Sequence, residues 1–292
     1  MSHLFKGVGV ALVTPFTKDH QIDFPALTKL VELQLNGGTD FLVVQGTTGE
    51  SPVLSQKEKM EVLHHVMEVN KSELPVVYGL GGNHTKALCT LVKELPKGVD
   101  GLLSVSPYYN KPLQAGIVQH YKELASHTDL PIILYNVPGR TSSNVNAETT
   151  LELSEIDNIV AMKEASGDFD QIMEIVKHKP DNFTLLSGDD AITLPLISIG
   201  VEGVISVVAN ALPERFSNMV HSAISGDFAR AHHEHYELID MTRLMFSEGN
   251  PGGVKEALLA REICGNSMRL PLVNVSDGLR DQIHQEMNRL LQ

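Results

Sequence analysis

The stretch Ile159-Val-Ala-Met-Lys-Glu-Ala-Ser-Gly-Asp168 contains a complete transition from a buried strand to a helix. Its first four residues are apolar, Lys163 follows them, and the last three supply turn and cap residues. The apolar residues Phe169, Ile172, Ile175 and Val176 then continue at helical spacing. An apolar strand followed closely by an amphipathic helix is typical of a parallel sheet covered by helices.

Lys163 is the residue of this stretch that indicates chemistry. A lysine at the end of a buried strand loses hydration, and desolvation favours the neutral amine, which attacks carbonyl groups. The alternative is a structural lysine that extends to solvent or pairs with Glu164. Because side chains alternate along a strand, Glu164 is expected to point away from Lys163.

The same alternation of strand and helix extends over residues 7–225. Strands are predicted at 7–15, 41–44, 75–78, 101–105, 131–135, 159–163, 183–187 and 203–206. A helix begins near Asp23 and Pro25, another follows the capping box of Ser55 and Glu58, and further helices are predicted at 84–95, 113–126, 147–154, 168–178, 190–199 and 212–225. About eight βα units of this size predict an α/β fold, a closed (β/α)8 TIM barrel.

An open, doubly wound sheet is the alternative fold. It is disfavoured because no Gly-x-Gly-x-x-Gly turn follows the first strand, and Gly79-Leu-Gly-Gly-Asn83 lacks the spacing of a phosphate-binding loop. After residue 226 the strand pattern stops, and helices are predicted at 227–246, 251–264 and 277–291. We therefore expect a catalytic barrel at 1–225 and a small C-terminal helical extension at 226–292.

Composition limits the possible functions of the 292-residue chain. A formal net charge of −13 disfavours nucleic acid and anionic membranes as partners. No apolar run has transmembrane length and the first residues do not resemble a signal peptide, so we expect a cytoplasmic protein. Cys89 and Cys264 are expected to be reduced thiols, and His232, His233 and His235 lack the spacing of a metal site.

Polar residues follow the predicted strands where active sites of (β/α)8 barrels lie, at the C-terminal strand ends. The segments concerned are Gly46-Thr-Thr-Gly-Glu50, Pro107-Tyr-Tyr-Asn-Lys-Pro112, Tyr135-Asn-Val-Pro-Gly-Arg-Thr141, Lys163, Ser187-Gly-Asp-Asp190 and Ile205. Each has a structural alternative: the first can be a tight turn, the tyrosines can pack, and Asp189 or Asp190 fits a helix N-cap better than a general base. Their convergence at one rim favours a catalytic site.

These motifs, in this order, resemble the pyruvate-dependent class I aldolase superfamily and, more narrowly, its dihydrodipicolinate synthase family. The resemblance covers essentially the whole chain. It implies a lyase in which Lys163 forms a Schiff base with pyruvate and the resulting enamine attacks the aldehyde of L-aspartate 4-semialdehyde, followed by cyclisation. This reaction is the first committed step of lysine and diaminopimelate biosynthesis.

The resemblance also implies roles for individual residues. Tyr135 is the expected proton donor and acceptor, with Thr47 and Tyr109 as relay partners and Tyr109 supplied by a neighbouring subunit. Thr48 is expected to bind the pyruvate carboxylate, with Gly188 and Ile205 lining that pocket. Arg140 is expected to bind the carboxylate of the semialdehyde, a task that suits a bidentate guanidinium. No metal or organic cofactor is expected, and the assembly is expected to be a homodimer or a homotetramer.

Two other functions remain as alternatives. One is another pyruvate aldolase of this superfamily, of the N-acetylneuraminate lyase or keto-deoxy sugar acid aldolase type, although such enzymes typically lack this arginine. The other is a non-catalytic sensor or interaction protein, for which retention of Lys163, Tyr135 and Thr47 is unexpected.

The sequence departs from the family pattern at two places. Asn250-Pro-Gly-Gly-Val-Lys255 carries two glycines where the family usually has Ile-Pro, which predicts a more flexible loop there, and Lys255 is interpreted as structural. Members inhibited by L-lysine resemble one another in carrying histidines where this chain has Gln56 and Lys59. A cationic Lys59 would repel a cationic effector, so inhibition is expected to be weak or absent.

Overall fold

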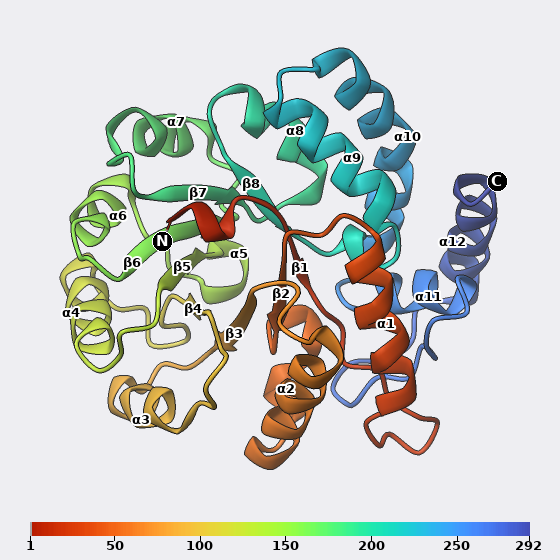
Figure 1. The fold of residues 1–292 in the computed structure, drawn as a ribbon, viewed down its shortest axis with the longest axis horizontal. Coiled ribbons are helices and arrows are strands. Elements are labelled where there is room, and N and C mark those ends of the chain that lie inside the picture. The colour runs from red at the N-terminus through yellow and green to blue at the C-terminus, as the bar shows by residue number, and fades with distance from the viewer. Residues whose placement is uncertain (1) are drawn as a thin grey trace.

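The computed structural model describes residues 2–292 and contains a closed, eight-stranded parallel barrel surrounded by helices (Figure 1). The strands follow one another around the barrel in chain order, and β1 closes the ring by pairing with β8. They are β1 Gly7–Ala11, β2 Phe41–Val44, β3 Val76–Leu80, β4 Gly101–Val105, β5 Ile132–Asn136, β6 Ile159–Glu164, β7 Thr184–Ser187 and β8 Gly203–Ser206. The predicted (β/α)8 barrel is therefore confirmed.

Helices follow the strands along the chain, and most of them cover the outside of the barrel, whereas the short α5 (Pro138–Thr141) lies at the C-terminal rim. The helices are α1 Phe24–Asn36, α2 Gln56–Asn70, α3 Thr85–Leu91, α4 Gln114–Ala125, α5 Pro138–Thr141, α6 Ala147–Ser154, α7 Phe169–His178, α8 Thr193–Ser198 and α9 Pro213–Ile224. Short 3-10 segments are η1 Ser2–Phe5, η2 Thr47–Gly49, η3 Ser51–Val53, η4 Val92–Glu94, η5 Asp190–Ile192 and η6 Val208–Asn210. The chain ends in α10 Phe228–Phe246, α11 Gly252–Ala260 and α12 Asp277–Leu290.

The predicted element bounds differ from the structure at a few ends. The first strand ends at Ala11 rather than at residue 15, because its ladder with β2 ends where Ala11 pairs with Val43. The helix predicted at 84–95 is α3 followed by η4, and Leu95 is extended, as expected for a residue before proline. The short helix α5 was not predicted from the sequence.

Local residue chemistry explains where several helices begin. Asp23 accepts a hydrogen bond from the Ala26 N–H at the start of α1, and Asp168 accepts one from the Gln171 N–H at the start of α7. Ser55 and Glu58 form the predicted capping box of α2. These caps begin each helix soon after the preceding strand or loop, which keeps the strand ends at one rim.

Apolar side chains fill two regions of the core. The larger region lies between the strands and the surrounding helices, and the smaller one lies inside the barrel. Phe5 of η1 belongs to the interior group and meets the Phe41 ring edge to face, with centroids 5.7 Å apart. Tyr135 lies in the same interior group, where the barrel interior meets its C-terminal rim.

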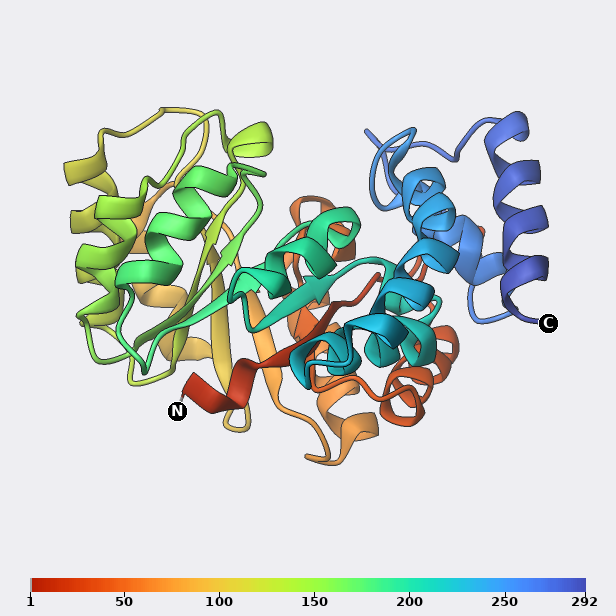
Figure 2. The same ribbon diagram turned by 90° about the horizontal axis from the view of Figure 1, so that it is seen from above.

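The last three helices pack against one another, and α10 also packs along α9 (Figure 2). The division of the chain at residue 225 remains a prediction. Gly252 and Gly253 form the first turn of α11, which agrees with the helix predicted at 251–264 and contradicts the flexible loop predicted at these glycines. A Cβ atom on Gly253 would lie 2.6 Å from the Cα atom of Met245 in α10. Glycine here permits the close contact of two helices. Among the described residues, no helix is both long enough and apolar enough to cross a membrane.

Candidate active site

A cavity of about 480 Å³ lies at the C-terminal ends of the strands. Residues from several strands and from α10 contribute to its wall: Ala11, Gly46, Thr47, Thr48, Leu103, Tyr135, Val137, Arg140, Lys163, Ala165, Gly188, Asp189, Ala191, Val207, Thr242, Arg243, Phe246, Ser247 and Asn250. Its position and size are those expected for the active site of a (β/α)8 barrel.

Lys163 and Tyr135 face each other inside this cavity. The two residues are paired in the register of β6 and β5, and Lys163 Nζ lies 4.6 Å from the centroid of the Tyr135 ring. Both residues are buried, with exposed fractions of 5% and 8%. Within the part of the chain that the structure describes, no hydrogen bond occupies the Lys163 amine or the Tyr135 hydroxyl. Both groups are therefore available to a small molecule in the cavity.

Glu164 does not pair with Lys163, as the alternation of the strand predicts. Its carboxyl group lies on the outer side of β6, where it accepts hydrogen bonds from Asn136, Ser166 and Gln171. Burial raises the pKa of Glu164 above its usual value. The alternative interpretation of Lys163 as one half of an ion pair with Glu164 is therefore wrong.

The Gly46–Glu50 segment brings Thr47 and Thr48 to the cavity on the 3-10 turn η2. The side chain of Thr48 is buried, and its hydroxyl oxygen accepts a hydrogen bond of 2.9 Å from Asn250 Nδ2. Sequence reasoning did not assign a site role to Asn250, nor to the α10 residues that line the cavity. The Asn250-Pro251 motif was the one available signal for this contact.

Arg140 lies on α5 and lines the same cavity. No other described residue accepts a hydrogen bond from its guanidinium, which leaves the group free to bind an anion. Arg140 also lines a second cavity of about 360 Å³, together with Tyr108 and Lys59. The two cavities share Thr47 and Tyr135 as well, so they adjoin each other at the rim.

Gly188 lies against the side chain of Lys163. A Cβ atom at this position would lie 2.6 Å from Ala165 Cβ and 3.1 Å from Lys163 Cε. Ile205 is buried in the barrel interior and is not among the described residues that line the cavity, whereas Val207 is. Its predicted contribution to the pocket remains a prediction.

Tyr109 is a predicted site residue that lies outside this arrangement. Its side chain is 89% exposed and does not line either cavity described above. Its backbone has a φ of +74°, and Lys111 has a φ of +48°, so two residues of the loop after β4 have a left-handed backbone conformation. Within one chain, Tyr109 is presented to solvent and not to Lys163.

Asp189 of the 187–190 segment is a helix N-cap, as predicted, whereas Asp190 bonds the backbone after β8. Asp189 accepts a hydrogen bond of 2.9 Å from the Ala191 N–H at the start of η5. The buried Asp190 carboxylate accepts hydrogen bonds from the N–H groups of Val207 and Val208, and burial raises the pKa of Asp190. These contacts hold the turn that places Val207 at the cavity.

Lys255 is the second buried lysine among the described residues, and its contacts are structural, as predicted. It forms a buried ion pair with Glu50 and donates a hydrogen bond of 2.8 Å to the Ser267 carbonyl oxygen. Burial lowers the pKa of Lys255, while Glu50 opposes that change. The ion pair connects the Gly46–Glu50 segment to α11, and Lys255 does not line the cavity.

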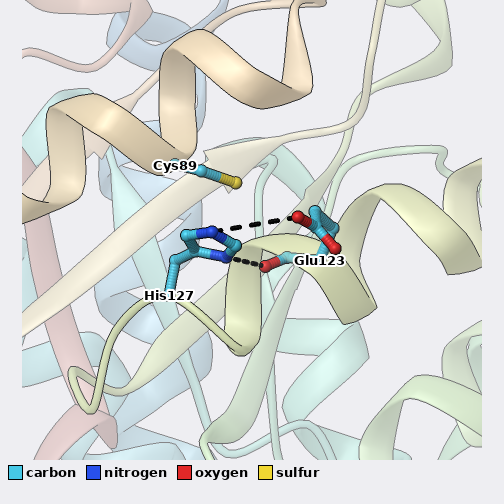
Figure 3. Close-up of side chains that lie close together, drawn as sticks. All are labelled: Cys89, Glu123 and His127. Atoms are coloured by element: carbon cyan, nitrogen blue, oxygen red, sulfur yellow. Dashed lines mark hydrogen bonds and ion pairs between the residues drawn. The ribbon is translucent and has the colours of Figure 1, made fainter.

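A group of three metal-ligating side chains lies outside the cavity, where Cys89 on α3 approaches Glu123 and His127 (Figure 3). Their ligand atoms lie within 4.8 Å of one another. Burial and the nearby Glu123 carboxylate raise the pKa of the Cys89 thiol, which disfavours the thiolate that binds metals. None of the three residues lines the cavity that contains Lys163.

The protein is a (β/α)8 barrel enzyme in which a buried lysine amine faces a tyrosine, in a cavity that also contains an arginine. The model of the dihydrodipicolinate synthetase family matches residues 4–290. The chain belongs to this family, and the resemblance inferred from its motifs is confirmed.

Individual relatives agree over almost the whole length. The 4-hydroxy-tetrahydrodipicolinate synthase of Parabacteroides distasonis is 47% identical over 287 residues, covering 98% of this chain and 97% of the relative. The crystal structure of dihydrodipicolinate synthase from Thermotoga maritima is similar with a TM-score of 0.95 and 38% identity, covering 98% of this chain and 99% of that one. A structure described as a monomeric dihydrodipicolinate synthase variant has a TM-score of 0.94 and 38% identity, covering 98% of both chains.

Proposed function

We propose that this chain catalyses the 4-hydroxy-tetrahydrodipicolinate synthase reaction, a lyase reaction that joins pyruvate to L-aspartate 4-semialdehyde. Membership of the family and homologues of that name support the activity. The observation that carries the assignment of the site is the buried Lys163 amine facing Tyr135 across the cavity. Such an amine suits Schiff-base formation with a keto acid.

The first half of the reaction uses Lys163 and Tyr135. The Lys163 amine attacks the keto carbon of pyruvate, and loss of water gives an iminium. The iminium withdraws electrons, so a methyl proton can leave to give an enamine. Tyr135, with its ring beside Nζ, is placed to shuttle the protons, and Thr47 at the rim is its proposed relay partner. Thr48, which Asn250 orients, binds the pyruvate carboxylate.

The second half uses Arg140. The enamine carbon attacks the aldehyde of the semialdehyde, and the substrate's own amine then displaces Lys163 as the ring closes. The Arg140 guanidinium donates no hydrogen bond to any other described residue. It can therefore form a bidentate contact with the substrate carboxylate. A cation at this place suits a short carboxylated aldehyde better than the polyhydroxy chain of a sugar acid, so the alternative aldolase activities are not favoured.

We also propose an oligomer, because the proposed relay residue Tyr109 can contribute only from another copy of the chain. The 89% exposure of Tyr109, on the loop after β4, supports this role. A homodimer is the smallest assembly that supplies it, and a homotetramer would supply it equally. A cytoplasmic location remains part of the proposal.

A substrate panel tests the proposed reaction. The purified enzyme is given pyruvate with L-aspartate 4-semialdehyde, and in parallel assays N-acetylneuraminate and a keto-deoxy sugar acid. We expect turnover in the first assay alone. An Arg140→Lys variant is expected to have a KM for the semialdehyde raised roughly 10- to 100-fold, with a smaller change for pyruvate, because lysine cannot make the bidentate contact. Faster cleavage of a sugar acid than condensation with the semialdehyde would contradict the proposal.

A further inference from the structure

The buried residues Asn136 and Glu164 lie directly behind the two residues that carry the proposed chemistry. In the register of β5 and β6, Tyr135 pairs with Lys163 and Asn136 pairs with Glu164. Because side chains alternate, Tyr135 and Lys163 face the cavity, whereas Asn136 and Glu164 face the helices. The exposed fractions of Asn136 and Glu164 are 0% and 2%.

Glu164 is held by hydrogen-bond donors and, among the described residues, by no cation. Asn136 Nδ2 lies 3.2 and 3.0 Å from its two carboxyl oxygens. The Ser166 N–H donates at 2.6 Å and Gln171 Nε2 at 3.0 Å. A buried acid without a counter-ion is costly, but four directional contacts fix its position and that of the strand end that carries it.

Asn136 extends this network to the segment that carries Arg140. Its Oδ1 accepts a hydrogen bond of 3.0 Å from the Val145 N–H, and its Nδ2 lies 2.7 Å from Asn144 Oδ1. These contacts close the loop of residues 137–144, on which Arg140 lies. One asparagine side chain therefore connects the end of β5, the end of β6 and the loop of the proposed carboxylate-binding arginine.

We propose that Asn136 and Glu164 form a positioning pair for the reaction. The pair holds the ends of β5 and β6 so that the Lys163 amine stays beside the Tyr135 ring, and it holds the Arg140 loop against the same cavity. Neither side chain contacts the substrates; both act through the residues next to them. This inference rests on the proposed function, because it assigns the pair to the geometry of that reaction.

Three variants test the pair. Glu164→Gln places an amide against the donors of Asn136 and Gln171, and Asn136→Asp places two carboxyl groups side by side. The double variant N136D/E164Q reverses the polarity of the contact, since the glutamine amide can donate to the aspartate. Glu155→Gln, an exposed residue just before β6, is the matched control.

Two measurements distinguish an effect on the positions of Lys163 and Arg140 from an effect on the stability of the fold. The rate of borohydride trapping with pyruvate reports the Lys163 step, and the KM values for the two substrates report the Arg140 loop. We expect each single variant to trap pyruvate roughly 10- to 100-fold more slowly, since small displacements of reacting groups have effects of that size. Asn136→Asp should also raise the KM for the semialdehyde more than that for pyruvate. The double variant should trap pyruvate at least about tenfold faster than the slower single variant.

Circular dichroism and melting curves establish which variants fold. Folded single variants that trap pyruvate at the wild-type rate would overturn the proposal, as would a double variant no faster than the slower single one. If the single variants do not fold, a folded double variant must trap at close to the wild-type rate. Loss of folding in all three assigns the pair to stability alone and overturns its positioning role. If the wild-type enzyme does not trap pyruvate, the proposed function itself fails, which is a distinct result.

Discussion

The placement of single atoms around Lys163 decides what this site can do. The amine is buried, has no hydrogen-bond partner among the described residues and lies beside one aromatic ring. The other buried lysine of the described residues, Lys255, forms an ion pair with Glu50 and lies outside the cavity. The structure therefore ties the Lys255 amine to a carboxylate, whereas the Lys163 amine forms no ion pair among the described residues and opens onto the cavity.

The space beside Lys163 is narrow, so we expect substitution of Gly188 by a larger residue to reduce activity. In a Gly188→Ala variant, the new methyl group would lie 2.6 Å from Ala165 Cβ and 3.1 Å from both the Glu164 carbonyl oxygen and Lys163 Cε, so the end of β6 must shift and displace the lysine side chain. We expect kcat and the rate of pyruvate trapping to fall roughly 10- to 100-fold while the protein stays folded. Steady-state kinetics and circular dichroism check this.

Gly278→Ala is the control for this substitution. A Cβ atom there would meet nothing within 4 Å, and Gly278 lies in α12, away from the cavity. The control should keep full activity. Wild-type trapping by a folded Gly188→Ala variant would show that the lysine side chain tolerates the displacement.

At the scale of secondary-structure elements, the strands and their order could be predicted from the sequence because apolar runs and caps are local signals. The end of β6 is one example: alternation alone placed Glu164 on the side opposite to Lys163. The partners of that side chain could not be predicted, because Asn136, Gln171 and the Asn144 loop come together only through strand register and helix packing. The contact between Asn250 and Thr48 joins residues 202 positions apart, so neither hydrophobic periodicity nor a helix cap predicts it.

Lys59, near the start of α2, affects the expected inhibition by L-lysine. Lys59 lines the second cavity with Tyr108 and Arg140, so a cationic ligand there would meet two basic side chains. We expect half-inhibition by L-lysine to require more than about 1 mM in a coupled assay, because like charges disfavour binding.

Variants on α2 refine this expectation. Lys59→Ala should bind L-lysine as well as or better than the wild type, whereas the exposed Lys57→Ala should not change inhibition. Sub-millimolar inhibition of the wild-type enzyme would contradict the expectation.

At the scale of the whole molecule, the C-terminal segment is attached to the barrel by charged contacts near the active-site rim. Arg269 forms an ion pair of 2.6 Å with Glu58 at the start of α2 and also donates to the carbonyl oxygens of His20 and Val53. The buried ion pair of Lys255 with Glu50 lies on the same side. These contacts explain how residues after 226 can form part of the cavity wall.

The ion pair of Glu58 with Arg269 predicts a pH dependence of stability. The hydrogen bond from Arg269 lowers the pKa of Glu58 from 4.5 to about 2. A lowered pKa in the folded state stabilises the protein above the unfolded-state pKa, and this contribution is lost as the pH falls from about 4.5 towards about 2. We expect Glu58→Gln to reduce the free energy of unfolding by about 1 kcal/mol at neutral pH, since solvent screens the partly exposed pair.

Urea unfolding at a series of pH values checks this prediction. The difference between Glu58→Gln and wild type should shrink as the pH falls below about 4.5. Glu61→Gln, which removes the exposed partner of Lys57 on the same helix, should show little difference at any pH. A difference for Glu58→Gln that does not depend on pH would assign its effect to packing rather than to charge.

If Lys163 is the amine that binds pyruvate, borohydride reduction must trap pyruvate on this residue. The enzyme is incubated with pyruvate, reduced and digested, and the modified peptide is identified by mass spectrometry. We expect a reduced pyruvate adduct on Lys163, no adduct on Lys255, and no adduct in a folded Lys163→Ala variant. An unmodified Lys163, or an adduct on another lysine that persists in Lys163→Ala, would contradict this expectation.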